Sequence, residues 1–362
     1  MRIHFPFILA LAVVLVSAAC QRRSAFDEFR IRRGTNISHW LSQSDRRGEE
    51  RRAWFTLKDV EFLAQAGFDH LRIPVDEEQL WTGSGELEPE AFELLHNGIK
   101  WCLANGLRVI VDLHILRSHH FNAAEKPLWT DPEAQQAFLD CWRDLSSELG
   151  DYPTSAVAYE LMNEAVADDP GDWNELLARA HSVVREREPE RVIVIGSNRW
   201  QSTDTFDRLK VPENDANIIL SFHFYTPMVL THYKASWTKV GEYSGPVSYP
   251  GQIIDPENLE GLDPGLVSEI ARHNGTFDRQ VLEQRLAKPL ALAQELDLPL
   301  YCGEWGCLPT VPETGRLAWY RDIRANFDSH GIAWATWDYK GGFGIVDREG
   351  EPIPSLIDVL LN

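Results

Sequence analysis

The sequence predicts a single α/β domain, a (β/α)8 TIM barrel with a long insertion after the sixth strand. Short apolar runs rich in β-branched residues alternate with helical segments along the chain. Eight such runs can be recognised, and a chain of 362 residues that is 44% hydrophobic can bury one large core. The barrel is expected to span residues 31–362, with its functional site at the carboxyl ends of the strands.

The expected strands follow one another in the order that a barrel requires. They are Arg33–Ile37, Phe68–Pro74, Leu107–His114, Ala156–Leu161, Arg191–Gly196, Ile218–Phe224, Pro299–Glu304 and Ile332–Trp337. A doubly wound open sheet is the competing architecture. The glycine fingerprint that grips phosphates in many such sheets is absent after the first run, which favours the closed barrel.

Helical segments of suitable length separate the strands. Pro89 and Pro132 lie in expected first turns, and Gly67, Gly106 and Gly331 follow expected last turns. The segments are Trp54–Ala66, Pro89–Asn105, Pro132–Leu149, Trp173–Glu188, a short link at Thr203–Arg208, Asp278–Glu295 and Gly315–His330.

The charge of the chain limits the class of partner. Its formal net charge is −20, from 35 Lys and Arg against 55 Asp and Glu. This charge argues against a nucleic-acid partner, because phosphate binding requires a basic surface, and it is compatible with a neutral polymer. No metal-ligand spacing is visible, so we expect no cofactor and no metal, and we expect a monomer.

The N-terminus has the layout of an export signal. An arginine at position 2 precedes an apolar stretch, and small residues then lead to Cys20. We expect residues 1–19 to be a lipoprotein-type signal peptide and residues 20–30 a linker. A lipid on Cys20 would then be the only attachment to a membrane, placing the protein on a bacterial outer membrane. Cleavage at an alanine would instead give a periplasmic or secreted protein.

Four further cysteines lie within the expected barrel: Cys102, Cys141, Cys302 and Cys307. A disulfide between Cys102 and Cys141, on successive helices, is one interpretation. Buried free thiols are the preferred interpretation for all four.

Two glutamates carry the clearest chemical signal. Glu164 and Glu304 each lie where an apolar strand breaks into a loop. A pair of carboxyl groups so placed can cleave a glycosidic bond, one protonating the leaving oxygen while the other attacks the anomeric carbon or activates water. The two groups must therefore differ in protonation at the same pH.

Other polar residues recur at the expected strand ends. An unpaired guanidinium inside a barrel is unfavourable, so Arg72 should have a carboxylate partner, for which Glu304 is the candidate. His223 and Tyr225 lie two apart and share a strand face. His114 and Trp337 close two further strands. Asp112 and Glu160 lie inside their strands and are expected to be buried pairing partners.

The long segment 226–278 is expected to form one wall of a cleft. It holds Tyr233, Trp237, Tyr243 and Tyr249, which would either stack on sugar faces or form the core of the loop itself. After the third strand, His119 and His120 are adjacent and point in different directions, so a solvated loop is preferred to a metal site.

These motifs together resemble glycoside hydrolase family five, the cellulase A family, over nearly the whole mature chain. The Asn–Glu, His–x–Tyr and Gly–Glu–x–Gly motifs occur in the family's order. The matching pieces are Gly34–Thr35–Asn36 with Trp40, Leu71–Arg72–Ile73–Pro74, Asp112–Leu113–His114–Ile115–Leu116, Asn163–Glu164, His223–Phe224–Tyr225, Gly303–Glu304–Trp305–Gly306, and Trp337 with Lys340–Gly341–Gly342–Phe343–Gly344.

The resemblance implies a role for each matching residue. Glu164 would be the general acid and then base, and Glu304 the nucleophile. Arg72 and Tyr225 would hydrogen-bond Glu304 and keep it ionised. Asn163 would donate to the sugar 2-hydroxyl. The remaining substrate-binding residues would be His114, His223, Trp337 as the floor under the sugar, and Trp40.

The resemblance further implies a retaining, endo-acting enzyme whose substrate partner is a β-1,4-glucan such as cellulose. Mannan, mixed-linkage glucan and β-1,3-glucan remain alternative substrates. A carbohydrate-binding surface lipoprotein without turnover is the alternative of another class. A serine esterase is a weaker alternative still, because the chain has no Gly-x-Ser-x-Gly elbow.

Overall fold

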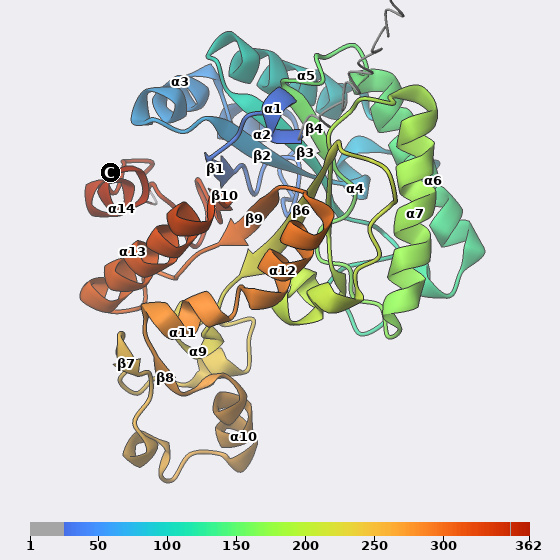
Figure 1. Cartoon of the computed structure of the whole chain (residues 1–362). Helices are drawn as coiled ribbons and strands as arrows, with labels where there is room; N and C mark the ends of the chain where they lie inside the picture. Colours follow the sequence, from blue (N-terminus) through green and yellow to red (C-terminus); the bar gives the residue numbers. More distant parts are fainter. Residues whose placement is uncertain (1–24, 348) are drawn as a thin grey trace, which may run out of the picture.

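A closed barrel of parallel strands forms the centre of the molecule (Figure 1). The computed structural model describes residues 25–347 and 349–362, so the predicted signal peptide and Cys20 lie outside the described residues. The strand order is β1-β10-β9-β6-β5-β4-β3-β2, and β1 pairs with both β2 and β10. The sheet therefore has no free edge, and the prediction of a single-domain TIM barrel is confirmed.

Each barrel strand coincides with one of the predicted runs, within a few residues at the ends. The strands are β1 (Arg33–Asn36), β2 (His70–Asp76), β3 (Arg108–Ile115), β4 (Val157–Glu160), β5 (Ile193–Gly196), β6 (Ile218–Phe224), β9 (Leu300–Trp305) and β10 (Ala333–Thr336). Two short strands, β7 (Gly251–Gln252) and β8 (Thr276–Phe277), form a separate antiparallel pair.

Helices surround the barrel; the helix predicted at Asp278–Glu295 is divided in two, and another predicted helix begins later than expected. The helix expected at Trp54–Ala66 breaks before α3, where Thr56 N–H donates to Asp59 Oδ2 at 2.7 Å and starts a new helix. The helices are α1 (Ala25–Glu28), α2 (Gly48–Trp54), α3 (Leu57–Ala66), α4 (Glu77–Leu80), α5 (Pro89–Ala104), α6 (Pro132–Leu149), α7 (Pro170–Arg187), α8 (Asn198–Gln201), α9 (Met228–Thr231), α10 (Pro264–His273), α11 (Arg279–Gln284), α12 (Ala287–Leu296), α13 (Glu313–His330) and α14 (Pro354–Leu361). The predicted link at Thr203–Arg208 is a 3-10 helix.

The barrel interior is filled by side chains from many strands and from the segment before β1. Phe29 is fully buried in one cluster with Ile110 of β3 and Tyr301 of β9. Burying such a ring contributes about 2–3 kcal/mol to folding. The segment predicted as a linker, residues 20–30, therefore contributes at least Phe29 to the barrel core.

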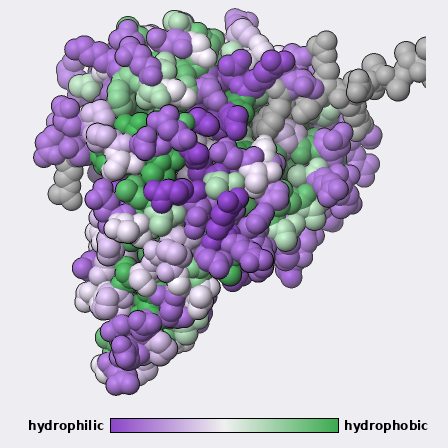
Figure 2. Space-filling model, turned by 60° about the vertical axis from the view of Figure 1, so that its left-hand side comes forward, coloured by the Kyte–Doolittle hydropathy of each residue, from purple (hydrophilic) through white to green (hydrophobic). Residues whose placement is uncertain are grey.

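Between β6 and β9 the chain forms a lobe that includes α9, the β7–β8 pair and α10, at the lower edge of Figure 1. Tyr233, Tyr243 and Tyr249 are buried and pack in the hydrophobic core, whereas Trp237 is 58% exposed. The three tyrosines are therefore core residues rather than sugar-stacking ones, but they belong to the main hydrophobic cluster and not to a separate core of the loop. Figure 2 shows the lobe beneath the main body, with hydrophobic residues in small patches among hydrophilic ones.

The four described cysteines, Cys102, Cys141, Cys302 and Cys307, are free and buried. The preferred prediction of buried thiols is confirmed, and the alternative Cys102–Cys141 disulfide does not form. Among the helices of residues 25–347 and 349–362, none is long and apolar enough to cross a membrane.

Candidate active site

The two glutamates singled out in the sequence lie together at the carboxyl ends of β4 and β9. Glu164 and Glu304 are 8% and 5% exposed, respectively. One oxygen of each carboxyl group and one ring nitrogen of His223 lie within 4.8 Å of one another. The barrel therefore brings close together two carboxyl groups that are 140 residues apart in the sequence, the difference between positions 304 and 164.

Arg72 on β2 binds three carboxylates at the centre of the barrel. Its Nη1 donates to Glu304 Oε1 at 2.9 Å, its Nε to Glu160 Oε2 at 2.7 Å, and its Nη2 lies 3.0 Å from Asp112 Oδ2. The partnership predicted for Arg72 and Glu304 is confirmed, and Asp112 and Glu160 are buried pairing partners as predicted. One cation cannot neutralise three anions, and burial raises the pKa of Asp112 to about 7.

Glu304 receives hydrogen bonds at both carboxyl oxygens. Besides Arg72, the phenol of Tyr225 donates to Glu304 Oε2 at 3.0 Å. Burial raises the pKa of Glu304 to about 7, while the charge of Arg72 and the phenol oppose that rise. Burial and the Glu304 charge raise the pKa of Tyr225, so the phenol keeps its proton and remains a donor. These contacts favour the ionised form of Glu304.

Glu164 lies in a different electrostatic environment. Its Oε1 is 2.9 Å from Nδ1 of His223, and burial lowers the pKa of that imidazole well below its usual range. A neutral imidazole does not supply a compensating positive charge. Burial and the negative charge of Glu304 raise the pKa of Glu164 well above its usual range. Glu164 is therefore the member of the pair that keeps its proton at neutral pH.

His114, Trp337 and Asn163 border the carboxyl pair. Asp112 Oδ2 is 2.7 Å from His114 Nδ1. The His114 imidazole stacks on the Trp337 indole, with ring centroids 5.4 Å apart and an interplanar angle of 6°. Asn163 Oδ1 accepts from Arg72 at 3.0 Å, and its buried Nδ2 has no hydrogen-bond partner among the described residues. A buried amide donor without a partner is available to a ligand hydroxyl.

The structure does not bring Trp40 into the site. Its indole is fully buried, donates to Arg51 O at 3.1 Å and packs on Phe55 at 4.9 Å. A ring with no exposed surface cannot stack on a sugar, so the substrate-binding prediction for Trp40 is wrong. The tryptophan instead anchors the segment after β1 to α2 and α5, where Gly98 lies against its ring.

His119 also differs from its predicted solvated state. The imidazole is fully buried, and its Nε2 accepts from Val166 N–H at 3.2 Å. It therefore joins the loop after β3 to the residues that follow Glu164. Two further residues that the sequence did not indicate lie at the site: Phe121 packs edge-on against His114 with ring centroids 5.9 Å apart, and Gln201 contacts Glu164 from the next loop. Neither residue belongs to a recognisable motif.

The Glu164, His223 and Glu304 atoms are also the described group best placed to hold a metal ion. Both oxygens of Glu304 already accept hydrogen bonds from Arg72 and Tyr225, which leaves them little capacity for a cation. A mechanism without a metal or cofactor stays a prediction.

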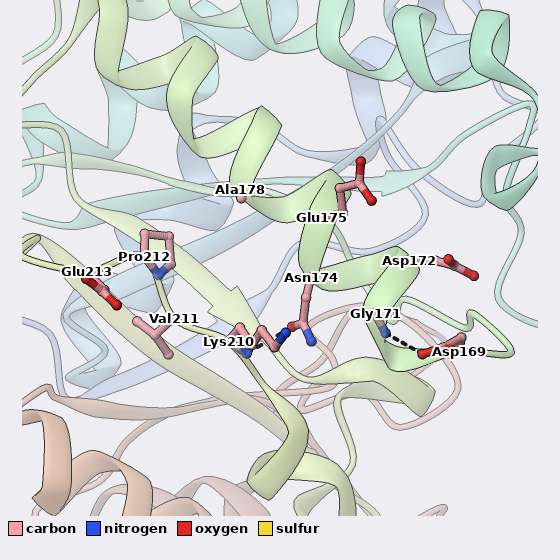
Figure 3. A pocket seen from close by; sticks show the side chains of 10 residues that line it. All are labelled: Asp169, Gly171, Asp172, Asn174, Glu175, Ala178, Lys210, Val211, Pro212 and Glu213. Carbon is pink, nitrogen blue, oxygen red and sulfur yellow. Dashed lines mark hydrogen bonds between the residues drawn. The ribbon is translucent and has the colours of Figure 1, made fainter.

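A separate hollow lies between the start of α7 and the segment 210–213 (Figure 3). Its carboxylates are Asp169, Asp172, Glu175 and Glu213, with Lys210 as the one cation in its lining. None of its lining residues belongs to the predicted site, and no aromatic ring among them offers a surface to a sugar. The hollow therefore shares no residue with the carboxyl pair at the barrel mouth.

Comparison with known families agrees with this geometry. Residues 38–342 match the sequence profile of the cellulase family, described as glycosyl hydrolase family 5. This match spans most of the chain and includes both glutamates. The chain belongs to glycosyl hydrolase family 5.

Individual relatives of this family 5 chain are distant but match nearly its full length. Endoglucanase C of Acetivibrio thermocellus is 29% identical over 334 residues, 90% of this chain and 97% of the relative. Cellodextrinase A of Ruminococcus flavefaciens is 28% identical over 305 residues, 83% of each chain. The solved endoglucanase Cel5A of Thermotoga maritima shares the fold, with a TM-score of 0.76 at 24% identity, covering 93% of this chain and 100% of that one.

Proposed function

We propose that this family 5 glycoside hydrolase is a retaining, endo-acting enzyme that cleaves β-1,4-glucosidic bonds in cellulose or related β-glucans. The carrying observation is the close approach of the carboxyl pair: one oxygen of Glu164, one oxygen of Glu304 and one ring nitrogen of His223 all lie within 4.8 Å of one another. Retaining enzymes hold their carboxyl groups about 5–5.5 Å apart, whereas inverting enzymes need about 6.5–9.5 Å to admit a water molecule. The approach of one oxygen from each group to within 4.8 Å favours the shorter of these two separations, and with it direct attack by one carboxylate.

In the first step, Glu304 attacks the anomeric carbon and forms a glycosyl ester, while Glu164 gives its proton to the departing sugar oxygen. Consumption of the Glu304 charge then lowers the pKa of Glu164, because its nearest anion is gone. Glu164 can now remove a proton from water. The resulting hydroxide equivalent cleaves the ester and restores both groups.

The surrounding residues fit this cycle. Arg72 and Tyr225 direct the two Glu304 oxygens, so the nucleophile is oriented before substrate arrives. The free amide of Asn163 would donate to the sugar 2-hydroxyl, a contact that strengthens as positive charge develops at the anomeric carbon. Trp337, held against His114, would support the sugar ring.

The stereochemistry of the product tests the proposal. Proton NMR of cellopentaose hydrolysis should show the β-anomer first, with the α-anomer appearing only through mutarotation. Initial release of the α-anomer would establish inversion and would contradict the role of Glu304 as nucleophile.

The pH dependence should follow the two carboxyl groups. We expect kcat/KM to rise with pH as Glu304 loses its proton, with a midpoint near its raised pKa of about 7. It should fall only at higher pH, when Glu164 loses the proton that it must donate. Initial rates on an aryl cellobioside across the pH range check this expectation, and an optimum in the acidic range would contradict it.

Glu164→Ala should affect substrates according to their leaving groups. Loss of the general acid should lower kcat/KM by about 10²–10⁴-fold on cellooligosaccharides, whose departing oxygen needs a proton. An aryl cellobioside with an acidic phenol needs none and should lose far less. Azide should give the β-glycosyl azide, because the anion enters from the side that Glu164 leaves open. Equal losses on both substrates would contradict the acid role.

The names of the relatives support a β-glucan substrate, since endoglucanase C and cellodextrinase A are both named for glucan chemistry. Mannan is the second candidate, because Cel5A of Thermotoga maritima has been solved with mannotriose as well as with cellobiose. Viscosity loss and reducing-sugar release on carboxymethyl cellulose, barley mixed-linkage glucan, β-1,3-glucan and mannan, with Glu304→Ala as control, distinguish these substrates. No activity on any polymer would favour a binding protein.

We also propose that the chain is exported and carries a lipid on Cys20. The support is the small-residue run before Cys20. Metabolic labelling with palmitate in a bacterial host should mark the wild-type chain and leave Cys20→Ser unlabelled. Equal labelling of both would contradict lipidation at this residue.

A further inference from the structure

The side chain of Gln201 is buried next to the carboxyl pair, and both the oxygen and the nitrogen of its amide form hydrogen bonds. Its Oε1 accepts from Glu164 N–H at 2.9 Å, and its Nε2 donates to Glu160 Oε1 at 3.0 Å and to Ser221 Oγ at 3.1 Å. The residue is 1% exposed. A flipped amide would face the Glu164 N–H with another donor, so these partners fix one orientation.

These bonds continue to the nucleophile. Glu160 accepts from Gln201 at one carboxyl oxygen and from Arg72 Nε at the other, the latter at 2.7 Å. Arg72 in turn donates to Glu304 at 2.9 Å. A continuous run of hydrogen bonds therefore joins the backbone of Glu164 to the carboxylate of Glu304 through fully buried groups.

The backbone at both ends of the Gln201–Glu164 contact is in the left-handed region. Glu164 has φ of 43°, and Arg199, Trp200 and Gln201 have φ of 59°, 61° and 50°, so the short element α8 is not a regular right-handed helix. None of these residues is glycine, and residues with a Cβ rarely adopt this conformation. The surrounding structure must therefore hold them in place.

Neighbouring residues leave room for this arrangement. β4 ends at Glu160, so Glu164 N–H lies beyond the strand ladder and finds its acceptor in Gln201. On β5, a Cβ at Gly196 would lie 2.3 Å from Gln201 Cγ and 2.5 Å from its Nε2. Glycine at position 196 is thus required for the amide to reach Glu164.

We propose that Gln201 is a positioning residue that sets the direction of the Glu164 carboxyl group relative to Glu304. This inference rests on the proposed function, because it assumes that Glu164 is the acid. Without the amide acceptor, the Glu164 N–H is buried without a partner and the left-handed backbone is free to relax. The carboxyl group then moves away from the leaving oxygen, and proton donation becomes less efficient.

Gln201→Met tests the role, since methionine has a similar length and cannot form these hydrogen bonds. We expect kcat/KM on cellotetraose to fall by about 10- to 100-fold, the scale of a small misplacement of a catalytic group. On 2,4-dinitrophenyl β-cellobioside, whose phenol leaves without a proton, the loss should stay within about threefold. Because kcat/KM reports formation of the glycosyl-enzyme, the comparison isolates the proton-donating step.

Gly196→Ala provides a second route to the same displacement, because its methyl group pushes Gln201 aside and leaves the amide intact. It should show the same dependence on the leaving group, and it keeps the inference testable if Gln201→Met does not fold. Gln79→Met is the matched control. Gln79 is also buried and hydrogen-bonded, to Arg51 at 3.0 Å, but lies on α4 outside the carboxyl network. Gln79→Met should lower Tm, and any loss of kcat/KM should be equal on cellotetraose and on the aryl cellobioside.

The outcomes separate the inference from the proposed function. Unchanged rates in folded Gln201→Met, or equal losses on both substrates, would overturn the positioning role while wild-type turnover upholds the enzyme assignment. A leaving-group preference in Gln79→Met as large as that of Gln201→Met would also overturn it. A wild-type chain that is inactive on both substrates would overturn the proposed function and the inference with it.

Discussion

Glu304→Ala is expected to abolish turnover, with a loss of kcat on the order of 10⁵-fold or more, as for removal of the nucleophile in other covalent enzymes. The physical reason is that Glu304 is the carboxyl group aligned by Arg72 and Tyr225, and no other described carboxylate shares that pair of donors. Azide is small enough to occupy the vacated space. With an activated aryl cellobioside it should restore cleavage and give the α-glycosyl azide.

The configuration of that product identifies the nucleophile. Azide that enters from the Glu304 side inverts the anomeric carbon once, whereas rescue with retained configuration would exchange the roles of Glu304 and Glu164. Glu304→Gln is the matched control for folding, because it keeps the side-chain volume and an acceptor for Tyr225. It should melt near the wild-type temperature, remain inactive and show little azide rescue, since the amide still fills the space.

Much of the barrel could be predicted because its strands are buried on both faces. Such strands appear as continuous apolar runs, and polar residues at their ends then stand out. The contact between Arg72 and Glu304 could be predicted for a related reason: a buried guanidinium requires a carboxylate, and the carboxyl ends of barrel strands converge. The family resemblance supplied the roles, which no periodicity reveals.

The errors concern residues just beyond the strands. Trp40 follows β1 by four residues, and nothing in the sequence shows whether its ring turns towards the barrel mouth or under α5. His119 was expected in a solvated loop because adjacent histidines point in different directions, yet the loop after β3 folds back and buries it against the residues after Glu164. Direction in a loop depends on distant contacts, which local patterns do not encode.

The position of Gln201 could be predicted even less from the local sequence. Three successive left-handed residues place it, and none is a glycine that would indicate such a turn. The one local indication is Gly196, where a Cβ would collide with the Gln201 side chain, and this requirement is visible only in the folded structure.

Arg72→Met should be the most destabilising single change at the site. It removes the cation shared by Asp112, Glu160 and Glu304, all buried. Breaking a buried ion pair from one side costs about 3–5 kcal/mol, because the remaining charge has no partner. Activity should fall as well, since Glu304 loses the charge that opposes the rise of its pKa.

The pH dependence of that loss distinguishes an electrostatic role from a packing role. Unfolded Asp and Glu side chains titrate near pH 4, whereas burial raises the pKa values of Asp112 and Glu160. Without Arg72 these folded pKa values rise further, so the folded variant binds more protons than its unfolded chain over a wider range, and its stability falls as pH increases. Urea unfolding should therefore show a larger deficit at about pH 8 than at about pH 5.

Arg191→Met is the matched control for this experiment. Arg191 is also fully buried and pairs with Glu188 at 2.6 Å, but it lies before β5, away from the carboxyl pair. Arg191→Met should destabilise the fold but leave the folded enzyme active, and the low-pH side of its kcat/KM profile should not shift. A pH-independent deficit in Arg72→Met, or a matching loss of activity in Arg191→Met, would show that Arg72 acts through packing alone. Two results together would show that the same guanidinium stabilises the barrel and keeps the nucleophile ionised. The loss of unfolding free energy in Arg72→Met would increase with pH, and the low-pH side of its kcat/KM profile would move to higher pH.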